Sequence, residues 1–171
     1  MEKIKKLKKI FKREKIDGYI IPKNDEFFGE YVSKDNDRLN YITNFTGSYG
    51  FSIILKDDNY LFVDGRYTLQ AKNESGKSFK IVTIPRILPK DIFKKKRLVI
   101  GFDPKIFTNQ VLVKLFRNTK CKLLPLNKNF IDEIWSRKIV NNKEKFYIFN
   151  NNFNSYDLKI NKIVNNLKNK G

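Results

Sequence analysis

Residues 51–63 read Phe-Ser-Ile-Ile-Leu, then Lys-Asp-Asp-Asn, then Tyr-Leu-Phe-Val, and this stretch decides the fold. The two apolar runs, 51–55 and 60–63, have the length and the β-branched or aromatic content of strands. The four polar residues at 56–59 are typical of a hairpin loop. The sequence therefore predicts an antiparallel pair of strands at this point.

Strands and helices alternate on both sides of the hairpin. Residues 19–21 form a short apolar strand that ends at Pro22, and Asp64 is placed to cap a helix directly after the hairpin. Further strands are expected at 79–84, 97–102 and 122–126, and helices at 2–15, 38–45, 66–72, 107–117 and 130–135. This alternation predicts an α/β domain with a mixed β-sheet flanked by helices, because the hairpin supplies an antiparallel pair.

The character of the chain changes after Trp135. Residues 137–154 are rich in Lys and Asn and weakly patterned, so we interpret 1–136 as one domain and 137–154 as a linker. An apolar helical face follows within 155–171, formed by Tyr156, Ile160, Ile163, Val164 and Leu167. We interpret this helix as the first element of a second domain that is cut off at Gly171.

Charge and composition exclude several classes of protein. The 171 residues carry 36 Lys and Arg against 18 Asp and Glu, a net charge of +18, with no histidine and one cysteine, Cys121. These counts exclude His- or Cys-based zinc sites, an internal disulfide and nucleophiles paired with histidine. Two-thirds of the positive excess lies in 1–15 and 137–171. We therefore interpret the basicity as incidental, because a nucleic-acid-binding face usually lies on the folded body.

No apolar run approaches the roughly 20 residues of a membrane span, and no secretion signal is apparent at the N-terminus. The first helix carries a narrow apolar stripe among its lysines, formed by Ile4, Leu7, Ile10 and Phe11. A membrane-surface helix or an organelle presequence is the alternative interpretation, but the narrow stripe without a Trp favours docking on its own domain. The sequence therefore predicts a cytoplasmic protein with no membrane partner.

No motif makes a credible catalytic centre by its own residues. Ser75-Gly76-Lys77-Ser78 imitates the end of a phosphate-binding loop, but Ala71 stands where the full pattern needs glycine. Cys121 opens a strand and is expected to be a small buried hydrophobe. Three carboxylate pairs are interpreted as solvated surface: Asp25 and Glu26, Asp57 and Asp58, and Asp132 and Glu133. We therefore predict no catalytic residue and no metal ligand in this chain.

Two segments that flank the hairpin remain unusual. Residues 41–50 read Tyr-Ile-Thr-Asn-Phe-Thr-Gly-Ser-Tyr-Gly, and residues 62–71 read Phe-Val-Asp-Gly-Arg-Tyr-Thr-Leu-Gln-Ala. On structural grounds alone, Gly47 and Gly50 would serve unusual backbone angles. Asp64 would act as a helix cap, and Arg66 and Tyr67 would pack on the sheet.

In this order and spacing, the two segments resemble the N-terminal domain of Xaa-Pro aminopeptidases, in the creatinase/prolidase group. The resemblance rests on Tyr41, the Phe-Thr-Gly-Ser-Tyr-Gly turn at 45–50 and the run Asp-Gly-Arg-Tyr-Thr-Leu-Gln-Ala at 64–71. Residues 17–22 and the pair Glu30-Tyr31 also fit the pattern. Residues 131–135 of this sequence resemble the segment that closes the first domain in three-domain members of the group. Residues 143–171 resemble the start of the second domain in those members.

The resemblance implies a mixed sheet with ribonuclease H-like architecture but without that enzyme's active site. In this family a C-terminal domain holds two divalent metals, commonly manganese, and the enzyme releases an N-terminal residue that precedes proline. This chain lacks that domain, so the resemblance implies a non-catalytic part that shapes substrate access and supports a homodimer. It places Arg38, Phe45, Thr46, Gly47 and Ser48 near a substrate entrance, with Asp64, Gly65, Arg66 and Tyr67 as a structural motif.

Two other functions stay open at this point. A free-standing binding module would pair with a separate chain through the apolar face of the 156–167 helix. A basic nucleic-acid-binding domain would depend on the net charge of +18, because its affinity would be mainly electrostatic.

Overall fold

The computed structural model describes residues 2–29, 31–137 and 156–169. The chain divides into two units, Met1–Ile139 and Val140–Gly171, which are described separately here. Apart from Arg137, the predicted linker lies outside the described residues.

Six strands form one mixed sheet in the first unit, in the order β4-β3-β2-β1-β5-β6. Their bounds are β1 Gly18–Pro22, β2 Gly50–Leu55, β3 Asn59–Asp64, β4 Lys80–Ile84, β5 Val99–Phe102 and β6 Lys122–Pro125. β2 pairs antiparallel with both β1 and β3, whereas the pairs β1–β5, β3–β4 and β5–β6 are parallel. The predicted hairpin is confirmed, and Phe51 pairs with Phe62 across it.

Both faces of this sheet are buried, because successive side chains of each strand point to opposite faces and both sets are apolar. In β3, Leu61 and Val63 belong to one core, whereas Tyr60 and Phe62 belong to the other. In the second core the rings of Phe51 and Phe62 stack with their centroids 4.6 Å apart. The continuous apolar runs in the sequence are therefore the consequence of two covered faces.

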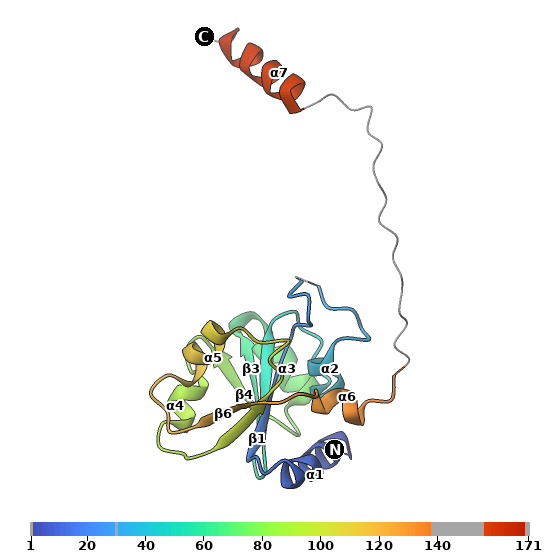
Figure 1. Cartoon of the computed structure of the whole chain (residues 1–171), viewed down its shortest axis with the longest axis vertical. Coiled ribbons are helices and arrows are strands. Elements are labelled where there is room, and N and C mark those ends of the chain that lie inside the picture. The colour runs from blue at the N-terminus through green and yellow to red at the C-terminus, as the bar shows by residue number, and fades with distance from the viewer. Residues whose placement is uncertain (1, 30, 138–155, 170–171) are drawn as a thin grey trace. The chain divides into compact units, whose positions relative to one another are not determined.

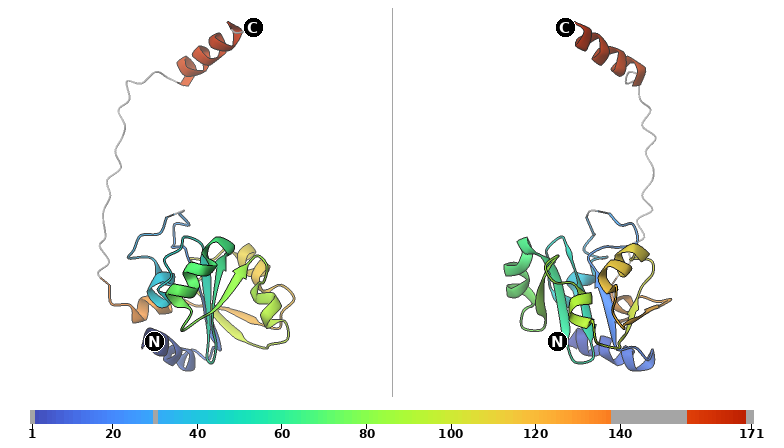
Figure 2. Two further views of the ribbon diagram at one scale, coloured as in Figure 1. Left: turned by 180° about the vertical axis from the view of Figure 1, so that it is seen from behind. Right: turned by 90° about the vertical axis from the view of Figure 1, so that its left-hand side faces the viewer.

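Helices form a layer on each face, and Figure 1 and Figure 2 show the two layers on either side of the strands. The face of Leu61 and Val63 is covered by α1 (Glu2–Arg13), α2 (Arg38–Thr43), α3 (Thr68–Ser75) and α6 (Phe130–Ile134). The opposite face is covered by α4 (Pro89–Phe93) and α5 (Asn109–Phe116). The apolar stripe of α1 is buried against its own domain, as its narrowness predicts.

The mixed sheet flanked by helices confirms the predicted fold class, although several local predictions differ. The helix expected over 66–72 is a 3-10 turn, η1 (Gly65–Tyr67), followed by α3, because the Asp64 side chain caps the short turn. The helix expected over 38–45 ends at Thr43, since Asn44 takes the left-handed conformation with φ 64°. α4 was not expected from the sequence, because five residues are too few to show a helical period.

α7 (Tyr156–Lys168) belongs to the second unit and is helical where the sequence predicts a helix. Its apolar face, Tyr156, Ile160, Ile163, Val164 and Leu167, is exposed among the described residues of that unit. None of the described helices is both long and apolar enough to cross a membrane.

Candidate functional site

The two unusual segments touch each other at one edge of the sheet. Because β2 begins where β3 ends, with Gly50 paired to Val63, the turn before β2 and the η1 turn after β3 lie side by side. The fully buried ring of Phe45 meets the ring of Tyr67 edge-on, with the centroids 5.9 Å apart. The hydroxyls of Ser48 and Tyr67 lie 2.7 Å apart. The two segments therefore form one packed unit.

Thr46 fastens the same turn to α3. Its backbone N–H and its hydroxyl donate to the Glu74 carboxylate at 2.9 and 2.7 Å, and Gln70 Nε2 donates to Thr46 Oγ1 at 2.7 Å. Burial alone would raise the pKa of Glu74, but the hydrogen bonds from Thr46 and Gln70 outweigh it and lower the pKa. Sequence reasoning missed Glu74, which lies three residues beyond the second segment.

The glycines of the turn are required by close contact and not by unusual backbone angles, which corrects the sequence interpretation. A Cβ on Gly47 would lie 2.8 Å from Phe45 Cε2 and closer still to Phe45 Cζ. A Cβ on Gly50 would lie 2.6 Å from the backbone oxygen of Phe62. Neither glycine has a φ in the left-handed region. Gly65 has no such contact, since its Cβ would meet its nearest neighbour, Thr83 Cγ2, at 3.7 Å.

Asp64 caps η1 as a short polar side chain should. Its Oδ1 accepts from the backbone N–H of Arg66 at 3.0 Å and from Arg66 Nε at 2.8 Å. These hydrogen bonds lower the pKa of Asp64. The prediction that Arg66 packs on the sheet is wrong, because its side chain is 76% exposed and turns back to Asp64. Tyr67 does pack against the core, as predicted.

Arg38 lies at the centre of a charge cluster that the sequence did not reveal. Its side chain is 3% exposed, and it donates to both oxygens of Asp132 at 2.8 Å and to Glu26 Oε1 at 2.7 Å. Burial would lower the pKa of Arg38, but the two carboxylates outweigh burial and raise it. Arg38 is therefore enclosed by its own ion pairs.

The interpretation of the carboxylate pairs as solvated surface is wrong for two of the three pairs, whereas Asp57 of the third pair is exposed. Asp25 is buried, Glu26 and Asp132 bind Arg38, and Glu133 binds Arg13. Arg137 Nη2 donates to Asp132 at 2.6 Å, and the Arg137 guanidinium lies 4.5 Å from the Trp135 ring centroid. The cluster thus joins the loop after β1, α2 and the end of α6. Its members are 12 and 94 residues from Arg38 in sequence, so local patterns could not reveal it.

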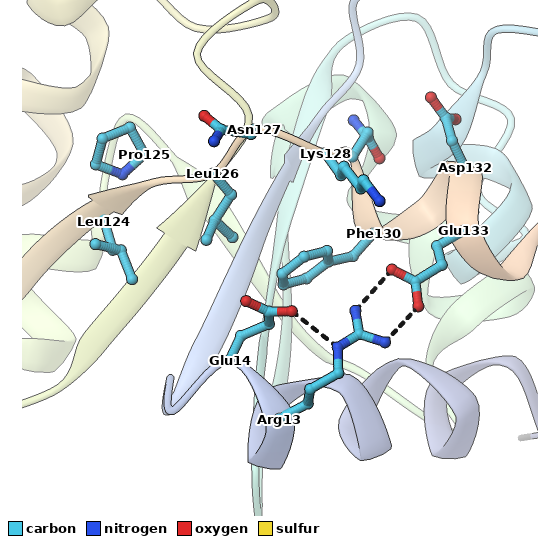
Figure 3. A pocket seen from close by; sticks show the side chains of 11 residues that line it. Arg13, Glu14, Leu124, Pro125, Leu126, Asn127, Lys128, Phe130, Asp132 and Glu133 are labelled. Carbon is cyan, nitrogen blue, oxygen red and sulfur yellow. Dashed lines mark hydrogen bonds and ion pairs between the residues drawn. The ribbon is translucent and has the colours of Figure 1, made fainter.

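A cavity of about 780 Å³ lies between the end of α1, β6 and α6 (Figure 3). At its mouth Arg13 donates to both oxygens of Glu133, at 2.7 and 2.8 Å, and to Glu14 at 2.8 Å. The single guanidinium thus pairs with one carboxylate next to it in sequence and with one on α6. The arrangement serves to hold the N-terminal helix to the domain.

A second cavity, of about 470 Å³, lies at the carboxyl edge of the sheet. Pro22, Asp64 and Ile84, the last residues of β1, β3 and β4, line it. So do residues of the loops that follow β1 and β5. Among the residues that the sequence placed in a site, only Asp64 lines this cavity.

The described part of the chain contains neither a metal-binding cluster nor a phosphate-binding loop. Within residues 2–29, 31–137 and 156–169, no three His, Cys, Asp or Glu side chains are grouped so as to hold an ion. The two-metal centre that the resemblance implies for the family therefore does not fit these residues. Ser75 and Gly76 close α3 instead of opening a helix, and Ser75 Oγ donates to the Thr43 carbonyl at 2.8 Å. Cys121 is half-buried, with Sγ 3.7 Å from the Lys96 carbonyl.

The six-stranded mixed sheet and the two interlocked segments at its edge identify the class of domain, but they do not identify a catalysed reaction. The family described as the Creatinase/Prolidase N-terminal domain matches residues 3–132. The chain belongs to this family, which confirms the resemblance carried by the two segments.

Similar sequences are aminopeptidases several times longer than this chain. A probable Xaa-Pro aminopeptidase P of Coprinopsis cinerea is 32% identical over 138 residues, which cover 75% of this chain and 22% of the relative. Aminopeptidase P1 of Lotus japonicus is 33% identical over 128 residues, covering 71% of this chain and 20% of the relative. The chain thus spans about a fifth of the length of these curated relatives.

Solved structures show the same fold. X-prolyl aminopeptidase from Caenorhabditis elegans, described as a cytosolic enzyme with a di-nuclear active site, matches with a TM-score of 0.71 at 27% identity. The match covers 78% of this chain and 25% of that one. The N-terminal domain of cytoplasmic peptidase PepQ from Mycobacterium tuberculosis H37Rv matches with a TM-score of 0.60 at 17% identity, covering 78% and 98% of the two chains. At that identity the second match shows the fold alone.

Proposed function

We propose that this chain is the non-catalytic N-terminal portion of an Xaa-Pro aminopeptidase. In the full enzyme, a metal-bearing portion would release the N-terminal residue of peptides that carry proline at the second position. The interlocked pair of segments at the sheet edge carries this proposal, because the residues that resemble the family pack together in one local structure within the matched residues 3–132. We further propose that the enzyme is cytoplasmic and acts without nucleic-acid or membrane partners.

The portion would shape substrate access and support a homodimer of the full enzyme. For substrate access, we propose that Arg38, Phe45, Thr46, Gly47 and Ser48 fix the form of the entrance. Their internal bonds support a positioning role in preference to direct contact: Arg38 is held by two carboxylates and Thr46 by Glu74. Ser48 is exposed, and its hydroxyl lies 2.7 Å from that of Tyr67.

Two assays test the proposed function. The pure chain with Mn²⁺ should release no N-terminal residue from an Xaa-Pro tripeptide, and robust metal-dependent release would overturn the non-catalytic assignment. Mixed with an Xaa-Pro aminopeptidase from which the N-terminal portion has been removed, the chain should bind and raise kcat/KM. The Arg38→Met variant, in which the cluster is broken, should raise it less. Failure of the wild-type chain to bind that enzyme would count against the proposed role.

The alternative is a free-standing binding module, and the exposed apolar face of α7 favours it. Such a face would drive association with a separate chain or with a second copy. Light scattering tests this association directly: a strictly monomeric pure chain would count against pairing of two copies through this face.

A further inference from the structure

The second cavity lies where the topology of the sheet creates a crevice. Open sheets of this kind place ligands outside the carboxyl ends of the strands, at the point where the strand order reverses. Here β2, β3 and β4 lie on one side of β1, whereas β5 and β6 lie on the other, so the order reverses between β1 and β5. The loops that follow these two strands meet at the cavity, where Asn24 Nδ2 donates to the Ile106 carbonyl at 2.8 Å.

The walls of the cavity are largely apolar and partly open. Ile84, Leu88, Ile106 and Leu115 come from the interior, and the rings of Phe28 and Tyr49 stand at the rim, 50% and 59% exposed. The volume of about 470 Å³ is within the usual range for small-molecule sites. A few polar groups in an apolar pocket of this size are typical of a binding site.

Phe28 is held in a strained backbone conformation at this rim. Its φ is 52°, in the left-handed region that a bulky side chain rarely adopts. Such strain persists where the surroundings impose it, and it is concentrated at functional sites. This backbone conformation places Phe28 in the lining of the cavity.

Two opposite charges complete the lining. Asp64 uses Oδ1 for Arg66, and its Oδ2 has no hydrogen-bond partner within the described residues. Lys114, on α5, forms no ion pair with any part of the chain that the structure describes. Asn24 commits its Nδ2 to Ile106, which leaves its amide oxygen as an acceptor. The cavity therefore offers acceptors for an ammonium group, a donor for a carboxylate, and an apolar body between them.

We propose that this cavity binds a short peptide zwitterion that carries apolar or aromatic side chains. The ammonium group of the ligand would be met by Asp64 and Asn24, its carboxylate by Lys114, and its side chains by the apolar walls. The inference goes beyond the proposed function, because the ligand binds to this chain without any metal-bearing portion.

The test is an NMR titration of the uniformly ¹⁵N-labelled full chain with the dipeptide Leu-Phe, in which the backbone amide chemical shifts are measured at each peptide concentration. Saturable shifts are expected at Asn24, Phe28, Tyr49 and Val111, but not around Arg13 and Glu133 in the other cavity. The same peptide acetylated and amidated at its ends should bind at least fivefold more weakly. Equal binding of the capped peptide would overturn the zwitterion assignment, and the absence of saturable shifts with Leu-Phe would overturn the site.

Two neighbours on α5 provide a matched pair of variants. Val111 lines the cavity and is 45% exposed, whereas Val113 is 53% exposed and does not line it. Val111→Glu should weaken Leu-Phe binding at least tenfold, while Val113→Glu should leave it within twofold. Val111 is the third residue of α5, a position that favours glutamate, so the helix is preserved. Equal effects of the two variants would contradict binding in this cavity.

Charge variants test the two ends of the ligand. Asp64→Asn keeps the capping acceptor, and Lys114→Gln removes the positive charge while keeping an unbranched polar side chain. Each variant should weaken the binding of Leu-Phe at least threefold and leave the binding of the capped peptide unchanged. Equal effects on the binding of both peptides would contradict the proposed contacts. The assay needs no peptidase activity, so its failure would leave the proposed aminopeptidase role standing.

Discussion

The hydroxyls of Ser48 and Tyr67 lie 2.7 Å apart, although one precedes the hairpin and the other follows it. The contact joins two residues 19 positions apart in sequence, at the edge where β2 begins and β3 ends. Directly beneath it, Tyr67 packs edge-on against the buried ring of Phe45. The relationship explains why the two segments occur together, since each provides half of one local structure.

A double-mutant cycle measures this relationship. Ser48→Ala and Tyr67→Phe each remove one hydroxyl from a partly exposed bond, so each should lower the free energy of unfolding by about 0.5–1.5 kcal/mol. The double variant should lose less than the sum of the two, because the same bond is removed twice. Urea unfolding of the four proteins gives the coupling. Strict additivity would show that the two hydroxyls act independently.

Alanine substitutions at Gly47 and Gly65 should have opposite effects on stability. Gly47→Ala should destabilise the domain by about 1–3 kcal/mol, because the new methyl group would overlap the buried ring of Phe45. Gly65→Ala should change stability by less than about 1 kcal/mol and in the stabilising direction, since its Cβ meets only an ordinary contact and alanine restricts the unfolded chain. Urea midpoints of the two variants compare them directly. Equal destabilisation would contradict the close-contact explanation for Gly47.

The sheet was predictable because its signals are local. The hairpin over 51–63 shows itself as two apolar runs with a polar loop, and both faces of the strands are buried, so the runs are continuous. The resemblance marked both unusual segments, but the contact between them was not predicted. Periodicity and composition contain nothing that places Ser48 against Tyr67.

Long-range polar pairing limited the prediction of the site. Asp132 is 94 residues from Arg38, and in sequence each is simply a charged residue in a polar stretch. The cavity between β1 and β5 was equally hidden, because its lining comes from four strands, from the loops beside them and from α5. Phe28 could not be singled out, since a positive φ at a non-glycine residue leaves no mark in the sequence.

Removing the buried guanidinium tests the charge cluster. Arg38→Met should destabilise the domain by about 3 kcal/mol, because Glu26 loses the cation that compensates it and Asp132 keeps only Arg137. The value lies at the lower end of the usual range, since Glu26 and Asp132 are one-third exposed and retain some hydration. Arg66→Met is the matched control and should leave the urea midpoint unchanged, because the Arg66 side chain is largely in solvent. Similar losses in both variants would contradict a special role for the cluster.

The pair of Arg13 and Glu133 should make stability depend on pH in a defined direction. The hydrogen bond from Arg13 lowers the pKa of Glu133, so the folded state holds this proton less tightly than the unfolded state. The stabilisation is therefore present above about pH 4.3, the usual glutamate pKa, and is lost as the pH falls through the lower folded value. Glu133→Gln removes this contribution. The gap in urea midpoint between wild type and Glu133→Gln should be largest near neutral pH and should narrow on acidification. The difference in urea midpoint between wild type and Arg13→Gln should narrow on acidification in the same way. High salt should reduce the difference between wild type and Glu133→Gln at pH 7, because the ion pair faces solvent. A gap that stays constant with pH would show that the pair does not couple α1 to α6.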